Sequence, residues 1–311
     1  MIRVNSEQPK VAIIILNWNG LEDTVECLES LKGMTYSNYE VVLVDNGSEG
    51  NDAEILRKRF GDYIHLIEND KNYGFAEGCN IGMKYALSNL NPDYILLLNN
   101  DTVVDPKFLT ELVQVAESDS SIGIVGPKIY YHDQPNKFQS AGGQISWWTG
   151  QESLVGCTQV DSGQFDEIRE VDWVIGCALL IKRETIREIG LLHAAYFAYV
   201  EETDWCARCA SSGYRIVYVP RAKVWHKRRI PVDRVDELGI YYMTRNQFLF
   251  MKRNATKLQF ISFLTHFFLR RFPFTAAGLL IRHKDLPSLA RYVAGIRDGI
   301  RLTLKGDRDG G

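Results

Sequence analysis

The sequence lacks the glycine-rich signatures with which many α/β proteins bind nucleotides. Neither G-x-G-x-x-G nor G-x-x-x-x-G-K-[ST] occurs in its 311 residues. The first signature accommodates a dinucleotide pyrophosphate, and the second holds the phosphates of a triphosphate on backbone N–H groups. Their absence disfavours an ordinary dehydrogenase or kinase.

Cysteines and long apolar runs are also scarce. The six cysteines are scattered, and Cys206 and Cys209 have no second C-x-x-C or His pair, so we expect free thiols and neither disulfides nor a zinc site.

The polar start MIRVNSEQPK leads into VAIIIL, a run too short for a signal peptide or a membrane span. We therefore expect a cytoplasmic protein.

Short apolar segments alternate with segments of helical periodicity over the first 130 residues. This pattern predicts a mainly parallel sheet that is covered by helices on both faces, because strands buried on both sides are continuously apolar. The predicted strands are 11–16, 40–45, 63–68 and 94–99, and the predicted helices start at Leu21, Ala53 and Phe75.

Polar loops follow three of these predicted strands: Asn17-Trp18-Asn19-Gly20, Asp45-Asn46-Gly47-Ser48 and Asn99-Asn100-Asp101. Each loop alone is an ordinary turn. Three of them at the carboxyl edge of one sheet favour a ligand site, since ligands of open α/β sheets bind there.

Eight segments, in this order, resemble the family 2 glycosyltransferases, in particular their rhamnosyltransferase-like branch. They are VAIIILNWNG, VVLVDNGS, NYGFAEGCNIG, LLLNNDTVV, VDWVIGCALLIKRE, YFAYVEETDWCAR, GYRIVYVPRAKVWH and YYMTRN. The resemblance implies a GT-A fold in residues 1–255, with a nucleotide-binding half at about 10–130 and an acceptor-binding half at about 131–255. Residues 256–311 form a separate basic tail in this prediction.

The resemblance also implies which residues bind the donor. Asp45 matches the acid that contacts the base. Asp101 matches the last acid of the D-x-D motif and His226 a histidine that reaches the metal or diphosphate, where Mg²⁺ or Mn²⁺ stabilises the departing diphosphate. Asn99 replaces the first acid, so weaker or water-mediated metal binding is expected. The other predicted nucleotide-binding residues are Asn17, Asn19, Asn72, Gly74, Phe75, Asn80 and Asn100.

For the chemistry, the resemblance implies inverting transfer from a nucleoside diphosphate sugar, with Glu202 as general base and Asp204 as its alternative. The acceptor is a saccharide or a lipid-linked saccharide in cell-surface polysaccharide or glycan synthesis. The resemblance favours dTDP-rhamnose as donor and leaves UDP- and GDP-sugars open. Residues expected near the donor or acceptor sugar are Asp172, Trp173, Gly176, Glu201, Trp205 and Arg245, although Trp205 could pack the core instead.

The last third of the chain is basic, with 18 Lys/Arg against 5 Asp/Glu from Arg221 to Lys305. Its apolar stretch 258–281 is interrupted by Arg270, Arg271 and Pro273, so it is a poor membrane span. Amphipathic helices lying on the inner face of the cell membrane are expected; packing on the catalytic domain or on a second subunit is the alternative.

Two other function classes stay open at this point. A nucleotidyltransferase would share the sheet and the metal-binding acid, and a non-catalytic scaffold would explain Asn99 in place of an acid. Nucleic-acid binding is not expected, because the aromatic residues of the tail alternate with aliphatic runs.

Overall fold

The first half of the sheet consists of parallel strands in the order β3-β2-β1-β4. The computed structural model describes residues 8–227, 237–282 and 284–305. In it these strands are β1 (Val11–Asn17), β2 (Tyr39–Asp45), β3 (Ile64–Glu68) and β4 (Tyr94–Asn99). All four strands predicted from the apolar runs are therefore confirmed.

The second half of the sheet is mixed. Strand β11 (Ala178–Lys182) lies antiparallel between β4 and β6 (Ile122–Tyr131), and β12 (Arg215–His226) runs parallel to β6. The remaining strands of this sheet are β5 (Thr102–Val104), β7 (Gln134–Ser140) and β10 (Arg169–Glu170), and β8 (Gly143–Ser146) with β9 (Gln151–Leu154) forms a separate hairpin. The result is the predicted mixed, mainly parallel α/β sheet of GT-A type.

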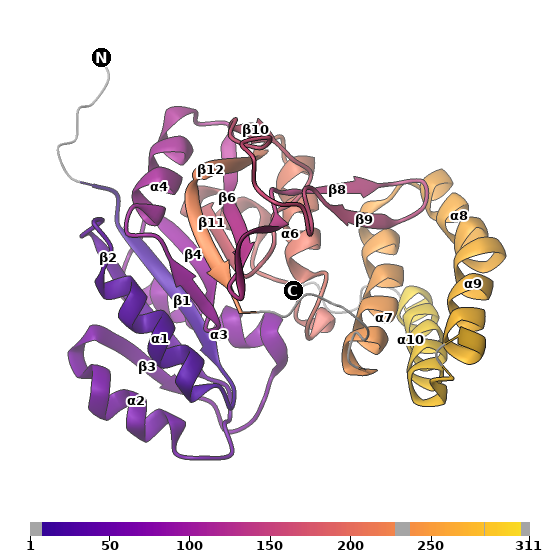
Figure 1. Cartoon of the computed structure of the whole chain (residues 1–311), viewed down its shortest axis with the longest axis horizontal. Coiled ribbons are helices and arrows are strands. Elements are labelled where there is room, and N and C mark those ends of the chain that lie inside the picture. Colours follow the sequence, from indigo (N-terminus) through magenta and orange to yellow (C-terminus); the bar gives the residue numbers. More distant parts are fainter. Residues whose placement is uncertain (1–7, 228–236, 283, 306–311) are drawn as a thin grey trace.

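Helices cover both faces of the sheet (Figure 1). Along β1, Ile13 and Ile15 pack toward one face and Ala12 and Ile14 toward the other. Both faces are buried, which explains why the strand is apolar from Val11 to Leu16. The first face carries α1 (Leu21–Lys32), α2 (Asp52–Phe60) and α4 (Phe108–Ser118), and the second carries α3 (Gly74–Asn89), α5 (Arg183–Ile189) and α6 (Glu201–Ser211).

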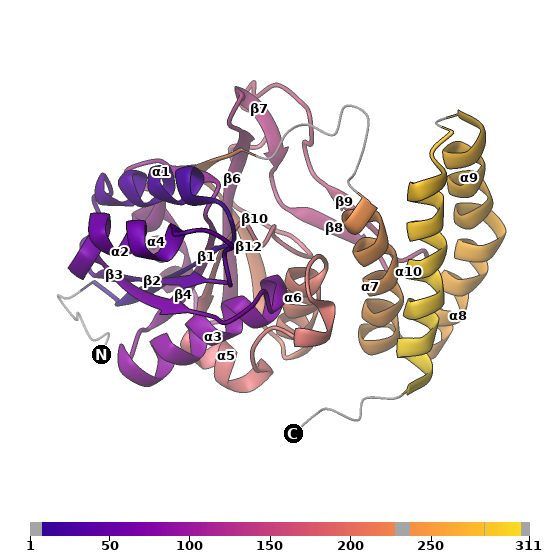
Figure 2. The ribbon, with the colours of Figure 1, turned by 90° about the horizontal axis from the view of Figure 1, so that it is seen from below.

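The C-terminal helices stand together beside the sheet (Figures 1 and 2). They are α7 (Glu237–Asn254), α8 (Lys257–His266), α9 (Phe272–Ala277) and α10 (Leu286–Lys305), with π-helical turns at Phe267–Arg271 and Gly278–Arg282. Phe248 of α7 contacts Phe263 and Phe267 at centroid distances of 5.3 and 4.8 Å. The tail thus packs on α7. In the described part of the chain, each helix is too short or too polar to cross a membrane.

The β8–β9 hairpin links the sheet to these helices (Figure 2). Trp147, in the turn of the hairpin, stacks on Phe250 of α7 at 5.5 Å, and Gln247 Nε2 donates to the Gly150 carbonyl at 2.5 Å. The division at residue 255 stays a prediction, and helix packing continues across it.

Two glycines of the C-terminal helices provide a matched test of this packing. A Cβ on Gly295 of α10 would lie 2.7 Å from the Tyr241 carbonyl oxygen of α7, whereas one on Gly278 would meet nothing within 4 Å. Gly295→Ala should lower the free energy of unfolding by about 1–3 kcal/mol through overpacking. Gly278→Ala should raise it by up to about 1 kcal/mol, since alanine favours helix. Denaturant unfolding measures both, and equal effects would contradict the close α7–α10 contact.

Candidate active site

The carboxyl ends of β1 and β2 are joined by a buried hydrogen-bond network. Asn17 Nδ2 donates to Asp45 Oδ1 at 2.7 Å and to Asp52 Oδ2 at 3.1 Å, and Ser48 Oγ donates to Asp45 Oδ1 at 2.6 Å. Asn17 is fully buried and Asp45 is 5% exposed. Asn17 therefore orients Asp45 from a fully buried position, whereas its predicted contact with the nucleotide stays a prediction.

Asn46 organises the loop before α3, a role that the sequence did not reveal. Its Nδ2 donates to Asn72 Oδ1 at 3.0 Å, and its Oδ1 accepts from the Tyr73 N–H at 3.2 Å. Asn72 Oδ1 also accepts from the Gly74 N–H at 2.7 Å. Gly74 has φ +82°, and a Cβ there would lie 2.5 Å from the Phe197 ring, so only glycine fits.

The other predicted nucleotide residues differ in their surroundings. Asn80 is buried and exchanges hydrogen bonds with the backbone of Leu192 at 2.9 and 3.1 Å, so it fixes α3 and does not face the edge. Phe75 is half-buried against the core. Asn19 Oδ1 accepts from the Glu49 N–H at 2.8 Å, and Asn100 Nδ2 donates to Thr24 Oγ1 at 2.9 Å.

Trp18 is a candidate contact that the sequence reading did not select. It follows β1 directly and is 51% exposed, beside the polar loops of the carboxyl edge. The sequence signal that could have identified Trp18 is its position between Asn17 and Asn19, in the polar loop after the first strand.

Asp101 and His226, 125 residues apart in sequence, form a pair with Nε2 and Oδ1 3.1 Å apart. The antiparallel register of β5 and β12 places His226 opposite Thr102, which explains the contact. Gln139 Oε1 holds the other ring nitrogen at 2.8 Å. Burial alone lowers the pKa of His226, but the neighbouring Cys177 and Asp101 raise it to about 10.

A divalent cation would have to displace the proton that this pKa places on His226; the pair then offers it one carboxylate and one imidazole. The described residues contain no group of three or more His, Cys, Asp or Glu side chains that could hold a metal. Asn99 Oδ1, two residues before Asp101, is buried and has no hydrogen-bond partner within the described ranges, so it can add an oxygen ligand. The donor set suits Mg²⁺ or Mn²⁺ if a ligand supplies further oxygens, as a diphosphate does.

Glu202 lies in the first turn of α6 and faces the segment that leads into β11. Its Oε1 is 3.4 Å from the Gly176 nitrogen. The next residue, Cys177, accepts from the Asn99 N–H at 2.9 Å and also neighbours His226. Gly176 and Cys177 thus link the candidate base to the Asp101–His226 pair. Any side chain at Gly176 would crowd Glu202, since its Cβ would lie 3.3 Å from that of Glu202.

Glu201 differs from Glu202 in its environment. It is 4% exposed, and burial together with the charges of Glu202 and Glu152 holds its pKa well above the usual range. The raised pKa of Glu201 reduces the negative charge beside Glu202, and the positive end of α6 favours a carboxylate there.

The loop before α6 is strained. Phe197, Tyr199 and Val200 have φ values of 63°, 70° and 73°, which are unfavourable for residues with a Cβ and most of all for a β-branched valine. Asn246 Nδ2 holds the loop by donating to the carbonyls of Tyr196, Ala198 and Tyr199, at 2.9, 2.8 and 2.7 Å.

Arg245 supports the same loop. Its Nη2 donates to the carbonyls of Ala195 and Tyr196, both at 2.7 Å, and its guanidinium lies over the Tyr242 ring. Arg245 thus positions the backbone before Glu202, and its predicted place beside a sugar stays a prediction.

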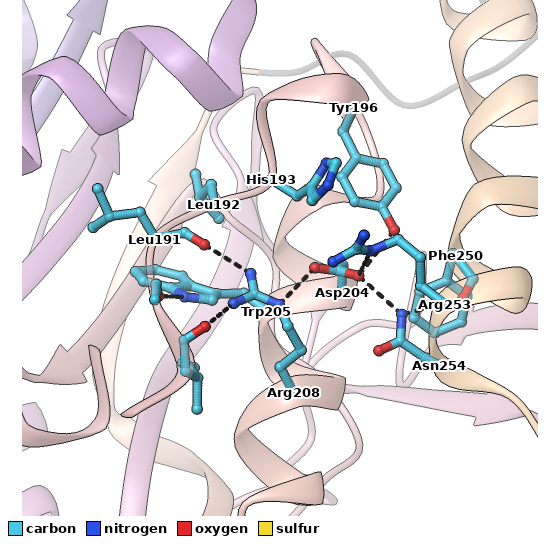
Figure 3. Close-up of polar contacts among 12 residues, drawn as sticks. Leu191, Leu192, His193, Tyr196, Asp204, Trp205, Arg208, Phe250, Arg253 and Asn254 are labelled. Carbon is cyan, nitrogen blue, oxygen red and sulfur yellow. Dashed lines mark hydrogen bonds and ion pairs between the residues drawn. The ribbon is translucent and has the colours of Figure 1, made fainter. Parts of the chain in front are cut away.

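Asp204 is the centre of a buried ion-pair network (Figure 3). It accepts from Arg208 Nε at 2.8 Å, Asn254 Nδ2 at 2.9 Å and the Tyr196 hydroxyl at 3.0 Å, and Arg253 Nε lies at 3.4 Å. Burial raises its pKa, but Arg208, Asn254 and Arg253 together bring the pKa below the usual 3.8. Burial and these partners disfavour Asp204, the alternative candidate, as the base.

Three further predicted sugar contacts have different surroundings. Trp205 is fully buried and donates from Nε1 to the Gly190 carbonyl at 2.8 Å. Trp173 is 6% exposed and packs against Gly143. Asp172 Oδ2 accepts from the Ile145 N–H at 2.8 Å and lines a groove beside Glu170. Packing explains the two tryptophans better than sugar stacking does.

Comparison with known proteins agrees with this geometry. The chain is 26% identical to the low-salt glycan biosynthesis hexosyltransferase Agl10 of Haloferax volcanii over 77% of its own length and 74% of that protein. It is 22% identical to the dTDP-rhamnosyl transferase RfbF of Shigella flexneri, over 87% and 89%. Other relatives are longer, and the chain spans 24% and 49% of two of them.

Among solved structures, the mannosyltransferase PcManGT of Pyrobaculum calidifontis in complex with GDP-Man and Mn²⁺ aligns with a TM-score of 0.58. The identity is 14%, with 98% of this chain and 89% of that chain covered. The likeness shows a shared GT-A fold.

The mixed sheet with its polar carboxyl edge defines a GT-A-type glycosyltransferase. More particularly, the chain belongs to glycosyl transferase family 2, whose model matches residues 12–173, and the model of glycosyl transferase family group 2 matches residues 94–282. It is therefore a glycosyltransferase that uses a nucleotide sugar, and membership disfavours the nucleotidyltransferase and scaffold alternatives.

Replacing Asp204 tests its structural role. Asp204→Asn should lower the free energy of unfolding by about 3–5 kcal/mol, because the buried arginines lose their counter-charge. The folded-state pKa lies below 3.8, so the contribution of Asp204 is present above pH 3.8 and is lost as the pH falls below that value. Denaturant unfolding of wild type and variant between pH 7 and 2.5 measures this; a constant difference over the whole range would contradict it.

Replacing Asn246 tests the clamp on the strained loop. Asn246→Ala removes three hydrogen bonds to backbone carbonyls, so the loop can relax and Glu202 moves. We expect turnover to fall about 100-fold, the scale of a displacement near 1 Å, with donor KM nearly unchanged. Lys252→Ala, at an exposed position of the same helix, serves as the control and should leave turnover near that of wild type. Equal turnover losses in the two variants would argue against a specific clamp.

Proposed function

We propose that the chain transfers a sugar, with inversion, from a nucleoside diphosphate sugar to a saccharide or lipid-linked acceptor in cell-surface polysaccharide or glycan synthesis. Rhamnose from dTDP-rhamnose is the first candidate donor, supported by the similarity to the dTDP-rhamnosyl transferase RfbF along 87% of the chain. UDP- and GDP-sugars are the alternatives, since PcManGT was solved with GDP-Man.

One observation carries this proposal. The Gly176–Cys177 segment contacts Glu202 on one side and neighbours the Asp101–His226 pair on the other. Inverting transfer requires a base for the acceptor hydroxyl and a partner for the departing diphosphate. Glu202 can be the base, and the Asp101–His226 pair can bind the cation that meets the diphosphate; both neighbour this short segment.

In the proposed reaction, Asp45 and the loops around it hold the nucleoside, and the diphosphate lies toward Asp101 and His226. A bound Mg²⁺ or Mn²⁺, held by Asp101, His226 and Asn99, would supply positive charge for the leaving diphosphate. Glu202 takes the proton from the acceptor hydroxyl as its oxygen attacks the anomeric carbon. The C–O bond to the diphosphate breaks, and the new glycosidic bond has the opposite configuration.

The C-terminal helices support a peripheral membrane contact on the inner face of the cell membrane. Lys284, Arg291, Arg297 and Arg301 are exposed on or beside α10, where they can meet anionic head groups. Large apolar side chains are exposed on the same helices: Leu258, Ile261, Phe268, Leu269, Phe274, Leu280, Ile281 and Leu286. Such a surface suits a lipid interface or a second copy of the chain.

Glu202→Gln tests the proposed function. The substitution keeps the size of the side chain and removes the base, so turnover should fall by roughly 10²–10⁴-fold while nucleotide affinity holds. A panel of dTDP-, UDP- and GDP-sugars with Mg²⁺ or Mn²⁺, measured by calorimetry and product formation, identifies the donor.

Asp101→Asn is the control for this experiment. It should abolish the metal-dependent part of nucleotide binding, whereas Asp45→Ala should weaken nucleoside binding with or without metal. Near-normal turnover of Glu202→Gln would refute the base assignment, and failure of every donor to bind would refute the proposed function.

A further inference from the structure

A cavity of about 660 Å³ lies between the hairpin and the C-terminal helices, apart from the polar loops of the carboxyl edge. Its walls come from the β8–β9 hairpin, the residue before α6, α7, the last residue of α8, the π-helical turn that follows it, and α9. This volume lies within the usual range of small-molecule binding pockets.

The positive charge of the cavity comes from Arg270 and Arg271. Arg270 is exposed and Arg271 is half-buried, with Nη1 donating to Gln247 Oε1 at 2.6 Å. Gln247 is itself fixed by its hydrogen bond to the Gly150 carbonyl, and it therefore orients the Arg271 guanidinium. The guanidinium has five N–H groups, so others can donate to a bound ligand. His266 adds a third nitrogen-bearing side chain.

Glu152 is the acidic side chain among the residues that line the cavity. Burial and the charge of Glu202 raise its pKa to about 8, and Arg271 acts in the opposite direction. Near pH 7 Glu152 is therefore mostly protonated and does not neutralise the two arginines. Val200, two residues before Glu202, also lines the cavity and places it near the candidate base.

We propose that this cavity binds a phosphate or diphosphate group of the acceptor, held by Arg270 and Arg271, and that the acceptor carries this group on a lipid chain. Guanidinium groups bind phosphate oxygens through paired, charge-assisted hydrogen bonds. The assignment rests on the proposed function, because it gives Glu202 an acceptor to deprotonate.

The lipid chain is inferred from the apolar side chains at the cavity and beside it. Phe274 and Met243 line the cavity and are 75% and 43% exposed. Leu269, adjacent to Arg270, is 77% exposed, and Ile261 and Ile281 extend the apolar surface along the same helices. A phosphate bound at the arginines would therefore have apolar surface next to it on which an aliphatic chain can lie.

Binding of farnesyl diphosphate to the full-length chain tests the proposal. Calorimetry is done with EDTA present, so that metal-dependent binding at the carboxyl edge does not contribute. Arg270→Gln and Arg271→Gln should each weaken binding about 10- to 100-fold, the scale of a charged hydrogen bond. Arg271→Lys should retain part of the affinity, and Arg301→Gln, an exposed arginine of α10, should bind like wild type.

Arg270 is exposed, so its substitution leaves the fold intact and keeps the test valid if Arg271→Gln unfolds. Farnesol and inorganic pyrophosphate are the matched probes and should bind at least tenfold more weakly than farnesyl diphosphate. Equal affinity of pyrophosphate would refute the lipid chain, and equal affinity of farnesol would refute the phosphate contact.

Two competitors complete the test. Displacement by phosphatidylglycerol vesicles would mean that the arginines bind membrane head groups in general, which would overturn the acceptor assignment. Displacement by dTDP or UDP would place farnesyl diphosphate in the nucleotide site and also overturn it. Donor binding and Glu202-dependent turnover are measured separately, so the proposed function can stand if the cavity assignment fails.

Discussion

The buried carboxylate of Asp204 is the interaction on which the geometry of the candidate site depends. It joins α6 to α7 through Arg253 and Asn254, and it joins α6 to the preceding loop through Tyr196 and Arg208. Moving a charge out of water is costly, and here arginines and hydrogen-bond donors compensate it from several sides. An acid two residues from the candidate base thus fixes the helix that carries that base.

The strained loop before α6 depends on the same helix pair. Its positive φ angles persist because Asn246 and Arg245 of α7 bind its carbonyl groups, while Phe197 stacks on Tyr242 at 5.0 Å. α7 also packs with the tail, so the C-terminal helices support the position of Glu202 indirectly. The tail is therefore part of the site's framework as well as a candidate membrane surface.

Local sequence determined the parallel half of the sheet, β3-β2-β1-β4. Short, mostly apolar runs, each followed by polar loop residues, specify buried parallel strands and their loops without reference to distant residues. The family was equally readable from its motifs, and the family models agree. The predicted carboxyl-edge residues Asp45 and Asp101 lie at the ends of the expected strands for the same reason.

Only the tertiary structure decided which polar residues have internal partners. Asn17, Asn80, Asp204 and Arg245 have the composition of a binding site, but each is committed to internal partners that lie far away in sequence. The contact of Asp101 with His226 depends on β5–β12 pairing, and the cavity of Arg271 depends on helices packing against the hairpin. Sequence patterns report local periodicity and residue chemistry; burial and partners arise only when distant segments pack together.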